Sequence, residues 1–459
     1  MATSPLLFVI CSSILVAVIA KYEPTWESLD SRPLPQWYDD AKIGIFIHWG
    51  VFAVPSFGSE WFWEFWKKGK LPAYVSFMEE NYPPGFTYQD FAPQFTAEFF
   101  DPEEWTRFST PPGLSTSSLP ANITKVLLFG LRRIHGTGTA WMLGRRGTWL
   151  VTWPALESKA PHIHFGLYHS LFEWFNPLYL QDKANYFHTN DFVATKTLPE
   201  LYDIVRNYEP EIIWSDGEAE AHDWYWNATV FLAWLFNNSP VKDTVVVNDR
   251  WGIGTPCKHG SFYTCADRYN PGTVQPHKWE NCMTLDKKSW GYRRNAVLAD
   301  YLTIHELITQ LAETVSCGGN ILINIGPTHD GRLPPIMEER LRQLGTWLGI
   351  NGGAIYGSRP WVHQNDSVTP GVWYTAKEDV TYAIVLNWPK KSSLLLASVE
   401  PTEQTKIFMF GYGDFLEEEL KFKSTKSGMV IKFPEMGEVR SQWAWVLIMT
   451  DIIPAAPRR

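Results

Sequence analysis

Two carboxylic acids stand in surroundings that suit acid–base chemistry. Asp216 closely follows the apolar run at 211–214, and Glu280 lies between Trp279 and Asn281 in an aromatic, loop-like stretch. An apolar neighbourhood raises the pKa of a carboxyl group, which an acid catalyst near neutral pH requires. Two carboxylates about 5–5.5 Å apart can cleave a glycosidic bond, one as nucleophile and one as acid/base. Most of the 49 acidic residues must be surface charges, so residue type alone does not establish this chemistry.

Several apolar runs in the first three quarters of the chain end abruptly in polar side chains. Buried strands with functional groups at their carboxyl ends are typical of a parallel barrel. Between them, apolar residues recur at helical spacing over 201–208, 304–315 and 337–348. This alternation predicts an α/β fold, a (β/α)8-like barrel over residues 21–358. The runs and the polar residues that follow are 43–47 with His48, 164–167 with Tyr168, 211–214 with Asp216, 244–247 with Arg250, and 320–323 with Asn324.

The pattern changes after residue 358. β-rich runs at 372–375, 382–386, 407–410, 429–433 and 445–449 are separated by Gly, Pro, Ser and Lys, with no helical pattern between them. These runs predict an antiparallel β-sandwich over residues 359–459. A sandwich behind a barrel either buttresses the barrel or binds sugar, and buttressing is the favoured interpretation.

Charge and hydropathy exclude some classes of partner. A net charge of −9 argues against nucleic acid, which requires a basic face. Residues 1–20 are typical of a secretory signal peptide cut after Ala20, with an apolar core at 6–19. A transmembrane anchor is the alternative, although the run is short and lacks basic flanks. No later segment is apolar enough to span a bilayer, so we expect no stable membrane insertion and a lysosomal or extracellular destination.

Export would place the cysteines in an oxidising compartment. Once Cys11 leaves with the signal, four cysteines remain, and Cys257 and Cys265 flank a short glycine-containing loop that makes them the expected disulfide. Metal binding is less favoured because no histidine spacing completes a zinc set. Glycosylation sequons also fit an exported chain, and they lie at Asn122, Asn227, Asn237 and Asn365.

A series of motifs carries a family resemblance. They are 35–38 (PQWY), 42–50 (KIGIFIHWG), 166–170 (GLYHS), 213–218 (IWSDGE), 247–252 (VNDRWG), 277–280 (HKWE), 289–294 (SWGYRR) and 318–327 (GGNILINIGP). With these motifs the chain resembles the α-L-fucosidases of glycoside hydrolase family 29, and closely those of the animal tissue type. The resemblance covers residues 24–105 and 163–450. It is too extended to arise by chance.

The resemblance implies roles for individual residues. Asp216 matches the family's nucleophile and Glu280 the acid/base of its animal branch, which implies a covalent fucosyl-enzyme. Trp290 either walls the pocket or belongs to the core. The family implies fucosylated glycans as partners, no metal or organic cofactor, and a homo-oligomer. Positions that hold the fucose ring and hydroxyls in the family are matched by His48, Glu60, Tyr168, Trp214 and Arg250.

The resemblance stops between Trp105 and about residue 161. Family members have here a strand of the type Ala-Gly-Ala-Lys-Tyr-Val-Val-Leu-Thr and then Lys-His-His-Glu-Gly-Phe, whose His-His pair contacts fucose. This chain has no His-His pair. Its charge balance also changes, because Glu157 is the only acid between Glu104 and Glu173.

A reading-frame shift accounts for this segment. One choice of codons for residues 112–119, read from one base earlier, encodes Ala-Gly-Ala-Lys-Tyr-Val-Val-Leu. In that same frame, codons for residues 122–126 contain His-His-Glu-Gly. We therefore predict that residues 106–161 are an out-of-frame translation, with a lineage-specific insertion as the alternative. If the chain exists as written, the apolar run at 123–131 would substitute for a fitted strand, with low stability and little activity.

These patterns leave three hypotheses for the function of the protein. The leading one is a retaining hydrolase that releases α-linked L-fucose from glycoproteins and glycolipids. The alternative is a catalytically impaired fucose-binding protein, because both carboxylates survive but the His-His pair does not. A third reading, another retaining glycosidase on a similar barrel, predicts faster turnover of aryl galactosides than of fucosides. A purely structural secreted protein would leave the aligned Asp216 and Glu280 unexplained.

Overall fold

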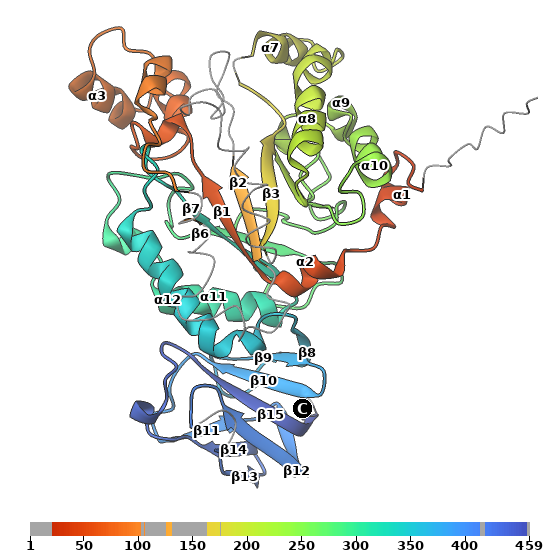
Figure 1. Ribbon diagram of the computed structural model, residues 1–459, viewed down its shortest axis with the longest axis vertical. Helices are drawn as coiled ribbons and strands as arrows, with labels where there is room; N and C mark the ends of the chain where they lie inside the picture. Colours follow the sequence, from red (N-terminus) through yellow and green to blue (C-terminus); the bar gives the residue numbers. More distant parts are fainter. Residues whose placement is uncertain are drawn as a thin grey trace, which may run out of the picture.

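A parallel sheet forms from the N-terminal part of the chain and two antiparallel sheets from the C-terminal part (Figure 1). The computed structural model describes residues 21–101, 105, 125–130, 163–174, 176–413 and 418–456, with the backbone alone at 125–130. The predicted signal peptide lies outside these residues. Within them, no helix is long and apolar enough to cross a membrane.

In the described residues the parallel sheet has seven strands in the order β5-β4-β3-β2-β1-β7-β6. All six residues of β1 and of β7 are buried, because both faces of these strands are covered. This explains why the apolar runs show no alternation with polar residues. The strands are β1 (Ile43–His48), β2 (Lys125–Gly130), β3 (Ile163–Ser170), β4 (Ile212–Asp216), β5 (Val246–Val247), β6 (Glu280–Thr284) and β7 (Asn320–Ile325).

Helices occupy the positions that apolar spacing predicts. Three regions of helical spacing form α8 (Leu198–Tyr208), α11 (Ile304–Ser316) and α12 (Pro335–Asn351). Thr303 caps α11 by accepting from the Glu306 amide. The other helices are α1 (Trp26–Asp30), α2 (Gln36–Ala41), α3 (Pro72–Asn81), α7 (Pro177–Ala184), α9 (Asp223–Trp226) and α10 (Ala228–Asn238), with short 3-10 or π segments η1 (Val51–Ala53), η2 (Glu64–Lys68), η3 (Tyr88–Gln94), η4 (Val193–Thr197), η5 (Glu218–Glu220), η6 (Leu298–Asp300), η7 (Gly352–Ala354) and η8 (Met436–Glu438).

Antiparallel pairing dominates after residue 358, as the sequence predicts. A five-stranded sheet in the order β12-β15-β10-β9-β8 and a three-stranded sheet in the order β11-β14-β13 contribute to one buried core. The strands are β8 (Arg359–Asn365), β9 (Val372–Lys377), β10 (Val380–Val385), β11 (Ser393–Leu396), β12 (Val399–Met409), β13 (Phe422–Thr425), β14 (Gly428–Lys432) and β15 (Trp445–Pro454).

The five-stranded sheet packs against the helices beneath the parallel sheet (Figure 1). Trp347 on α12 donates its indole N–H to the carbonyl of Ala444 at 2.9 Å, and Asn351 donates to Ser441 Oγ at 2.8 Å. All four side chains are buried. These contacts favour the buttressing interpretation of the C-terminal sheets.

Strand β2 belongs to the segment that the frame-shift hypothesis singles out. It lies between β1 and β3 and pairs with both in parallel register. The apolar run at 123–131 therefore supplies a strand, as expected for the chain as written. The rest of residues 106–161 lies outside the described part of the chain.

Candidate active site

Asp216 is the last residue of β4, so its carboxylate lies at the carboxyl edge of the parallel sheet. Tyr168 on β3 donates its phenolic proton to Asp216 Oδ2 at 2.5 Å, and Arg250 Nη1 lies 3.3 Å from Oδ1. The Asp216 side chain keeps 27% of its surface exposed. A carboxylate that is oriented by two donors and still open to solvent suits a nucleophile.

Arg250 follows β5 and links two carboxylates. Its Nη2 lies 2.7 Å from Asp267 Oδ1, and its Nε donates to Thr264 Oγ1 at 3.0 Å. The guanidinium lies over the Trp214 ring, 4.7 Å from the centroid. Burial would lower its pKa, but the charges of Asp216 and Asp267 raise it above the usual value. Arg250 therefore remains a fixed cation among acidic groups.

Two acids at this edge were not predicted from the sequence. Asp267 shares Arg250 with Asp216, and 46% of its side chain is exposed. Glu218 lies close enough to Asp216 and Arg250 to interact electrostatically with both, and burial raises its pKa. One signal for Asp267 was available, since it stands two residues after Cys265, a predicted half-cystine.

Glu280 lies at the amino end of its strand, whereas Asp216 lies at the carboxyl end of β4. Glu280 is the first residue of β6, four residues before Thr284, which corresponds to a rise of about 13 Å along the strand. Its side chain is only 4% exposed. Tyr38 donates to Oε2 at 2.8 Å and Trp214 Nε1 to Oε1 at 3.0 Å. Burial raises the pKa of Glu280 to about 7, although both hydrogen bonds oppose the rise.

Trp214 lies between the two predicted carboxylates. Its indole N–H binds Glu280, and its ring face receives the guanidinium that pairs with Asp216. The expected arrangement, in which Asp216 and Glu280 meet across one sugar ring at the sheet edge, is not supported by this placement. The reason is local: the motif 277–280 ends where β6 begins, so Glu280 lies at the amino end of the strand.

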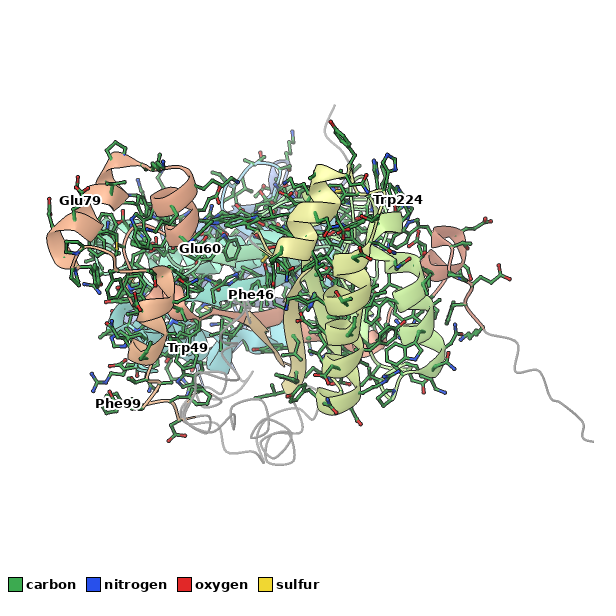
Figure 2. The ribbon with its side chains drawn as sticks, turned by 90° about the horizontal axis from the view of Figure 1, so that it is seen from above. Phe46, Trp49, Glu60, Glu79, Phe99 and Trp224 are labelled. Atoms are coloured by element: carbon green, nitrogen blue, oxygen red, sulfur yellow. A yellow bond between two sulfur atoms is a disulfide. The ribbon has the colours of Figure 1, made fainter. Side chains whose placement is uncertain are left out.

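The remaining predicted sugar-binding residues surround the Asp216 edge. His48, the last residue of β1, shares a 2.7 Å hydrogen bond with Asn324 Oδ1. Its ring lies 5.7 Å from Tyr168 and 5.3 Å from Trp290. Glu60 Oε2 accepts from the Trp290 amide at 3.0 Å. In the view from above, Glu60 is carried by the segment between β1 and α3, whereas Trp224 lies at the outer rim (Figure 2).

The cysteine prediction is confirmed in the structure. Cys257 and Cys265 form a disulfide, and Cys282 and Cys317 are free and buried. Among the residues with described positions, no group of three or more His, Cys, Asp or Glu side chains is arranged to hold a metal ion.

The fold and the acidic cluster at the carboxyl ends of parallel strands are typical of a glycoside hydrolase. A family model described as alpha-L-fucosidase matches residues 9–114 and 151–353, and one for the alpha-L-fucosidase C-terminal domain matches residues 364–450. The chain belongs to the α-L-fucosidase family. Residues 115–150, left unmatched, fall within the proposed out-of-frame segment.

Individual relatives agree with this assignment. Plasma alpha-L-fucosidase of Rattus norvegicus is 50% identical over 452 residues, covering 94% of each chain. Tissue alpha-L-fucosidase of Homo sapiens is 48% identical over 445 residues, covering 94% of this chain and 92% of the relative. The crystal structure of Thermotoga maritima alpha-fucosidase with a mechanism-based inhibitor superposes with a TM-score of 0.74 at 27% identity, covering 94% of this chain and 100% of that one. The protein therefore hydrolyses α-L-fucosyl linkages of fucosylated glycans, and the binding-protein alternative is not favoured.

Proposed function

We propose that Asp216 is the nucleophile of a retaining mechanism. Its carboxylate would attack the anomeric carbon of fucose and displace the aglycone, forming a covalent fucosyl-enzyme. Tyr168 and Arg250 hold one oxygen each, so the attacking group is oriented before substrate arrives. The observation that carries this proposal is a partly exposed carboxylate with two fixed donors at the sheet edge.

The acid/base that best fits the geometry is Asp267. It would protonate the leaving oxygen and then deprotonate the incoming water. The two nitrogens of one guanidinium hold Asp216 and Asp267, which supports a separation compatible with a retaining pair. Glu280, the sequence-based candidate, is enclosed by Tyr38 and Trp214 and is better explained as a buried acid of the core.

We assign the substrate contacts to the residues around Asp216. We propose that His48 and Glu60 bind fucose hydroxyls, since imidazole and carboxylate offer directional hydrogen bonds. Tyr168, Trp214 and Trp290 present aromatic surface to the 6-deoxy methyl group, which has no polar group to offer. The family's His-His contact has no counterpart in this sequence.

We propose that the parallel sheet closes into a (β/α)8-like barrel, because a backbone segment connects its two edge strands. Residues 261–263 bridge these strands: the Ser261 amide donates to Val247 in β5, and the Tyr263 amide donates to Lys278, each at 2.9 Å. The Glu280 amide at the start of β6 donates back to Tyr263 at 2.9 Å. A short segment that pairs with both edges supports a closed barrel over residues 21–358, with a β-sandwich domain over 359–459.

The secretory pathway is the proposed route of this protein. The disulfide, the N-terminal apolar segment and the relatives named plasma and tissue alpha-L-fucosidases support a lysosomal or extracellular destination. We also propose that the protein forms a homo-oligomer and that it binds neither nucleic acid nor membranes.

The out-of-frame origin of residues 106–161 also remains a proposal. It is supported by the gap at 115–150 in the family match. Sequencing the transcript across this region tests it directly. Bases that encode Ala-Gly-Ala-Lys-Tyr-Val-Val-Leu in the shifted frame are expected, and their absence would exclude a frame shift.

Turnover of aryl sugars tests the proposed function as a whole. The purified protein should hydrolyse an aryl α-L-fucoside, and Asp216→Gly should abolish turnover. The aryl β-D-galactoside serves as the specificity control. Equal or faster turnover of the galactoside, or unchanged turnover by Asp216→Gly, would contradict the assignment.

A further inference from the structure

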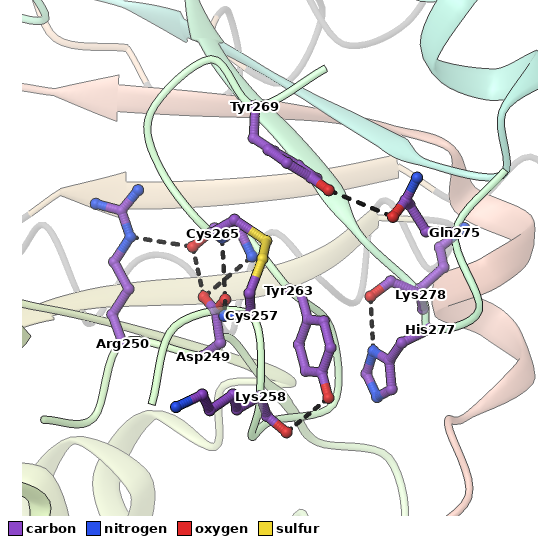
Figure 3. The surroundings of a disulfide bond; sticks show 11 residues. Asp249, Arg250, Cys257, Lys258, Tyr263, Cys265, Tyr269, Gln275, His277 and Lys278 are labelled. Carbon is purple, nitrogen blue, oxygen red and sulfur yellow. Dashed lines mark hydrogen bonds between the residues drawn. A yellow bond between two sulfur atoms is a disulfide. The ribbon is translucent and has the colours of Figure 1, made fainter. Parts of the chain in front are cut away.

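The disulfide closes a loop that lies between two residues of the proposed active site. In sequence, the loop bounded by Cys257 and Cys265 stands between Arg250 and Asp267. Figure 3 shows Asp249 pointing into this loop, beside the disulfide and Arg250. The loop therefore connects a buried acid to the groups that surround Asp216.

Asp249 ties the two ends of the loop together. One carboxylate oxygen, Oδ2, accepts from the amides of Cys257 at 2.7 Å and Cys265 at 2.9 Å. The other, Oδ1, accepts from the amide of Thr264 at 3.0 Å and from its hydroxyl at 2.6 Å. The side chain is fully buried, and these four donors supply the hydrogen bonds that a buried carboxyl group requires.

Thr264 connects Asp249 to Arg250 in the proposed active site. Its hydroxyl has a single hydrogen, which it donates to Asp249 Oδ1. The oxygen lone pair is then left to accept from Arg250 Nε at 3.0 Å. Since Nη1 and Nη2 of Arg250 contact Asp216 and Asp267, the direction of the guanidinium depends on Thr264 and Asp249.

The loop backbone needs such constraints. Cys257 and Cys265 adopt left-handed backbone conformations with φ of 59° and 54°, and Arg268 next to Asp267 has φ of 59°. Residues with a Cβ atom avoid this region. Conformations of this kind persist where the surrounding structure enforces them, and they cluster at functional sites. Here the enforcing contacts are the disulfide and the four hydrogen bonds to Asp249.

We propose that Asp249 and the Cys257–Cys265 disulfide act together as a positioning device that aims Asp267 at the leaving group through Thr264 and Arg250. The inference rests on the proposed function, in which Asp267 is the acid/base. Asp249 itself touches no reacting atom. Its loss should therefore affect leaving-group protonation more than nucleophilic attack by Asp216.

Leaving-group dependence separates these two effects. α-L-Fucosyl fluoride needs little protonation of its leaving group, whereas 4-methoxyphenyl α-L-fucoside depends on an acid. For Asp249→Asn, and for Cys257→Ser with Cys265→Ser, kcat/KM on the aryl fucoside should fall by about 100-fold, the scale of general acid catalysis. Turnover of the fluoride should change little.

Asp30→Asn is the matched control. Asp30 contacts the same loop from outside, accepting from His259 Nδ1 at 2.7 Å and from the Gly260 amide at 3.3 Å, with no part in the path to Arg250. This variant should keep the same ratio of aryl fucoside to fluoride turnover as the parent. A parallel loss in the control would overturn the proposal, because any disturbance of the loop would then suffice.

Two further variants fix the interpretation. Thr264→Val keeps the side-chain volume, removes the hydroxyl and should reproduce the selective loss even if Asp249→Asn does not fold. Equal losses on both substrates, or no loss, in Thr264→Val and the double cysteine variant would overturn the positioning role. Asp267→Asn reports separately on the proposed function: if it shows no selective loss on the aryl fucoside, the acid assignment fails and the positioning inference fails with it.

Discussion

Replacing Glu280 with glutamine tests whether this buried acid is catalytic or structural. The Glu280 carboxyl is enclosed by Tyr38 and Trp214, and burial raises its pKa from 4.5 to about 7. A group whose pKa is higher in the folded than in the unfolded state contributes stability fully below the unfolded pKa and loses it as pH rises through the folded pKa. The glutamine variant cannot titrate, so it lacks this loss.

The size of the effect follows from the shift. One pKa unit corresponds to about 1.4 kcal/mol, so the rise from 4.5 to about 7 corresponds to roughly 3 kcal/mol. Between pH 4 and pH 8, the free energy of unfolding of the parent protein should fall relative to that of Glu280→Gln by this amount. Lys42 has its pKa lowered to about 7, chiefly by burial and then by Lys278, but it titrates in both proteins and cancels in the comparison.

Urea unfolding at several pH values, followed by tryptophan fluorescence, measures this difference. Fucoside turnover should be measured on the same two proteins without urea. Glu280→Gln should keep the parent's rate on 4-methoxyphenyl α-L-fucoside and on α-L-fucosyl fluoride. Stability differences that stay constant from pH 4 to pH 8 would refute the reasoning about the buried acid. A selective loss on the aryl fucoside would instead identify Glu280 as the acid/base.

Two further predictions concern the site edge and the surface. Gly217→Ala should lower kcat/KM on an aryl fucoside at least tenfold with only a modest loss of stability. Gly217 follows Asp216 and has a φ of 89°, and an added Cβ would lie 2.4 Å from the Phe172 ring. Unchanged kinetics would contradict this prediction. Mass spectrometry of the secreted protein should find glycan on the exposed Asn365 but not on Asn237, whose amide nitrogen donates to the carbonyls of Tyr22 and Ala233; glycan on Asn237 would contradict the packing.

The elements that place Asp216 were accessible from the sequence. Uninterrupted apolar runs gave the buried parallel strands, and their polar ends located His48, Tyr168 and Asp216 at one sheet edge. Periodic apolar residues gave α8, α11 and α12 for the same reason: burial of one helix face fixes the spacing. These predictions depend on local patterns that repeat along an element.

The acid/base that we propose, Asp267, was not accessible in this way. The resemblance implies that Glu280 is the acid/base, but the sequence does not say at which end of a strand its motif falls, and the structure places Glu280 at the start of β6. Asp267 lies in an irregular loop whose shape depends on the disulfide and on four hydrogen bonds to Asp249. Loop geometry of this kind has no periodic signal, so only the three-dimensional arrangement brings Asp267 to Arg250.

Trapping the covalent intermediate tests the central claim most directly. A 2-deoxy-2-fluoro-α-L-fucosyl fluoride should inactivate the enzyme, because the 2-fluorine slows both formation and hydrolysis of the glycosyl-enzyme, whereas the activated fluoride leaving group speeds only its formation. Peptide mass mapping should then find the 2-fluorofucosyl label on Asp216. A label on another carboxylate, or unlabelled protein after complete inactivation, would contradict the assignment of Asp216 as the nucleophile.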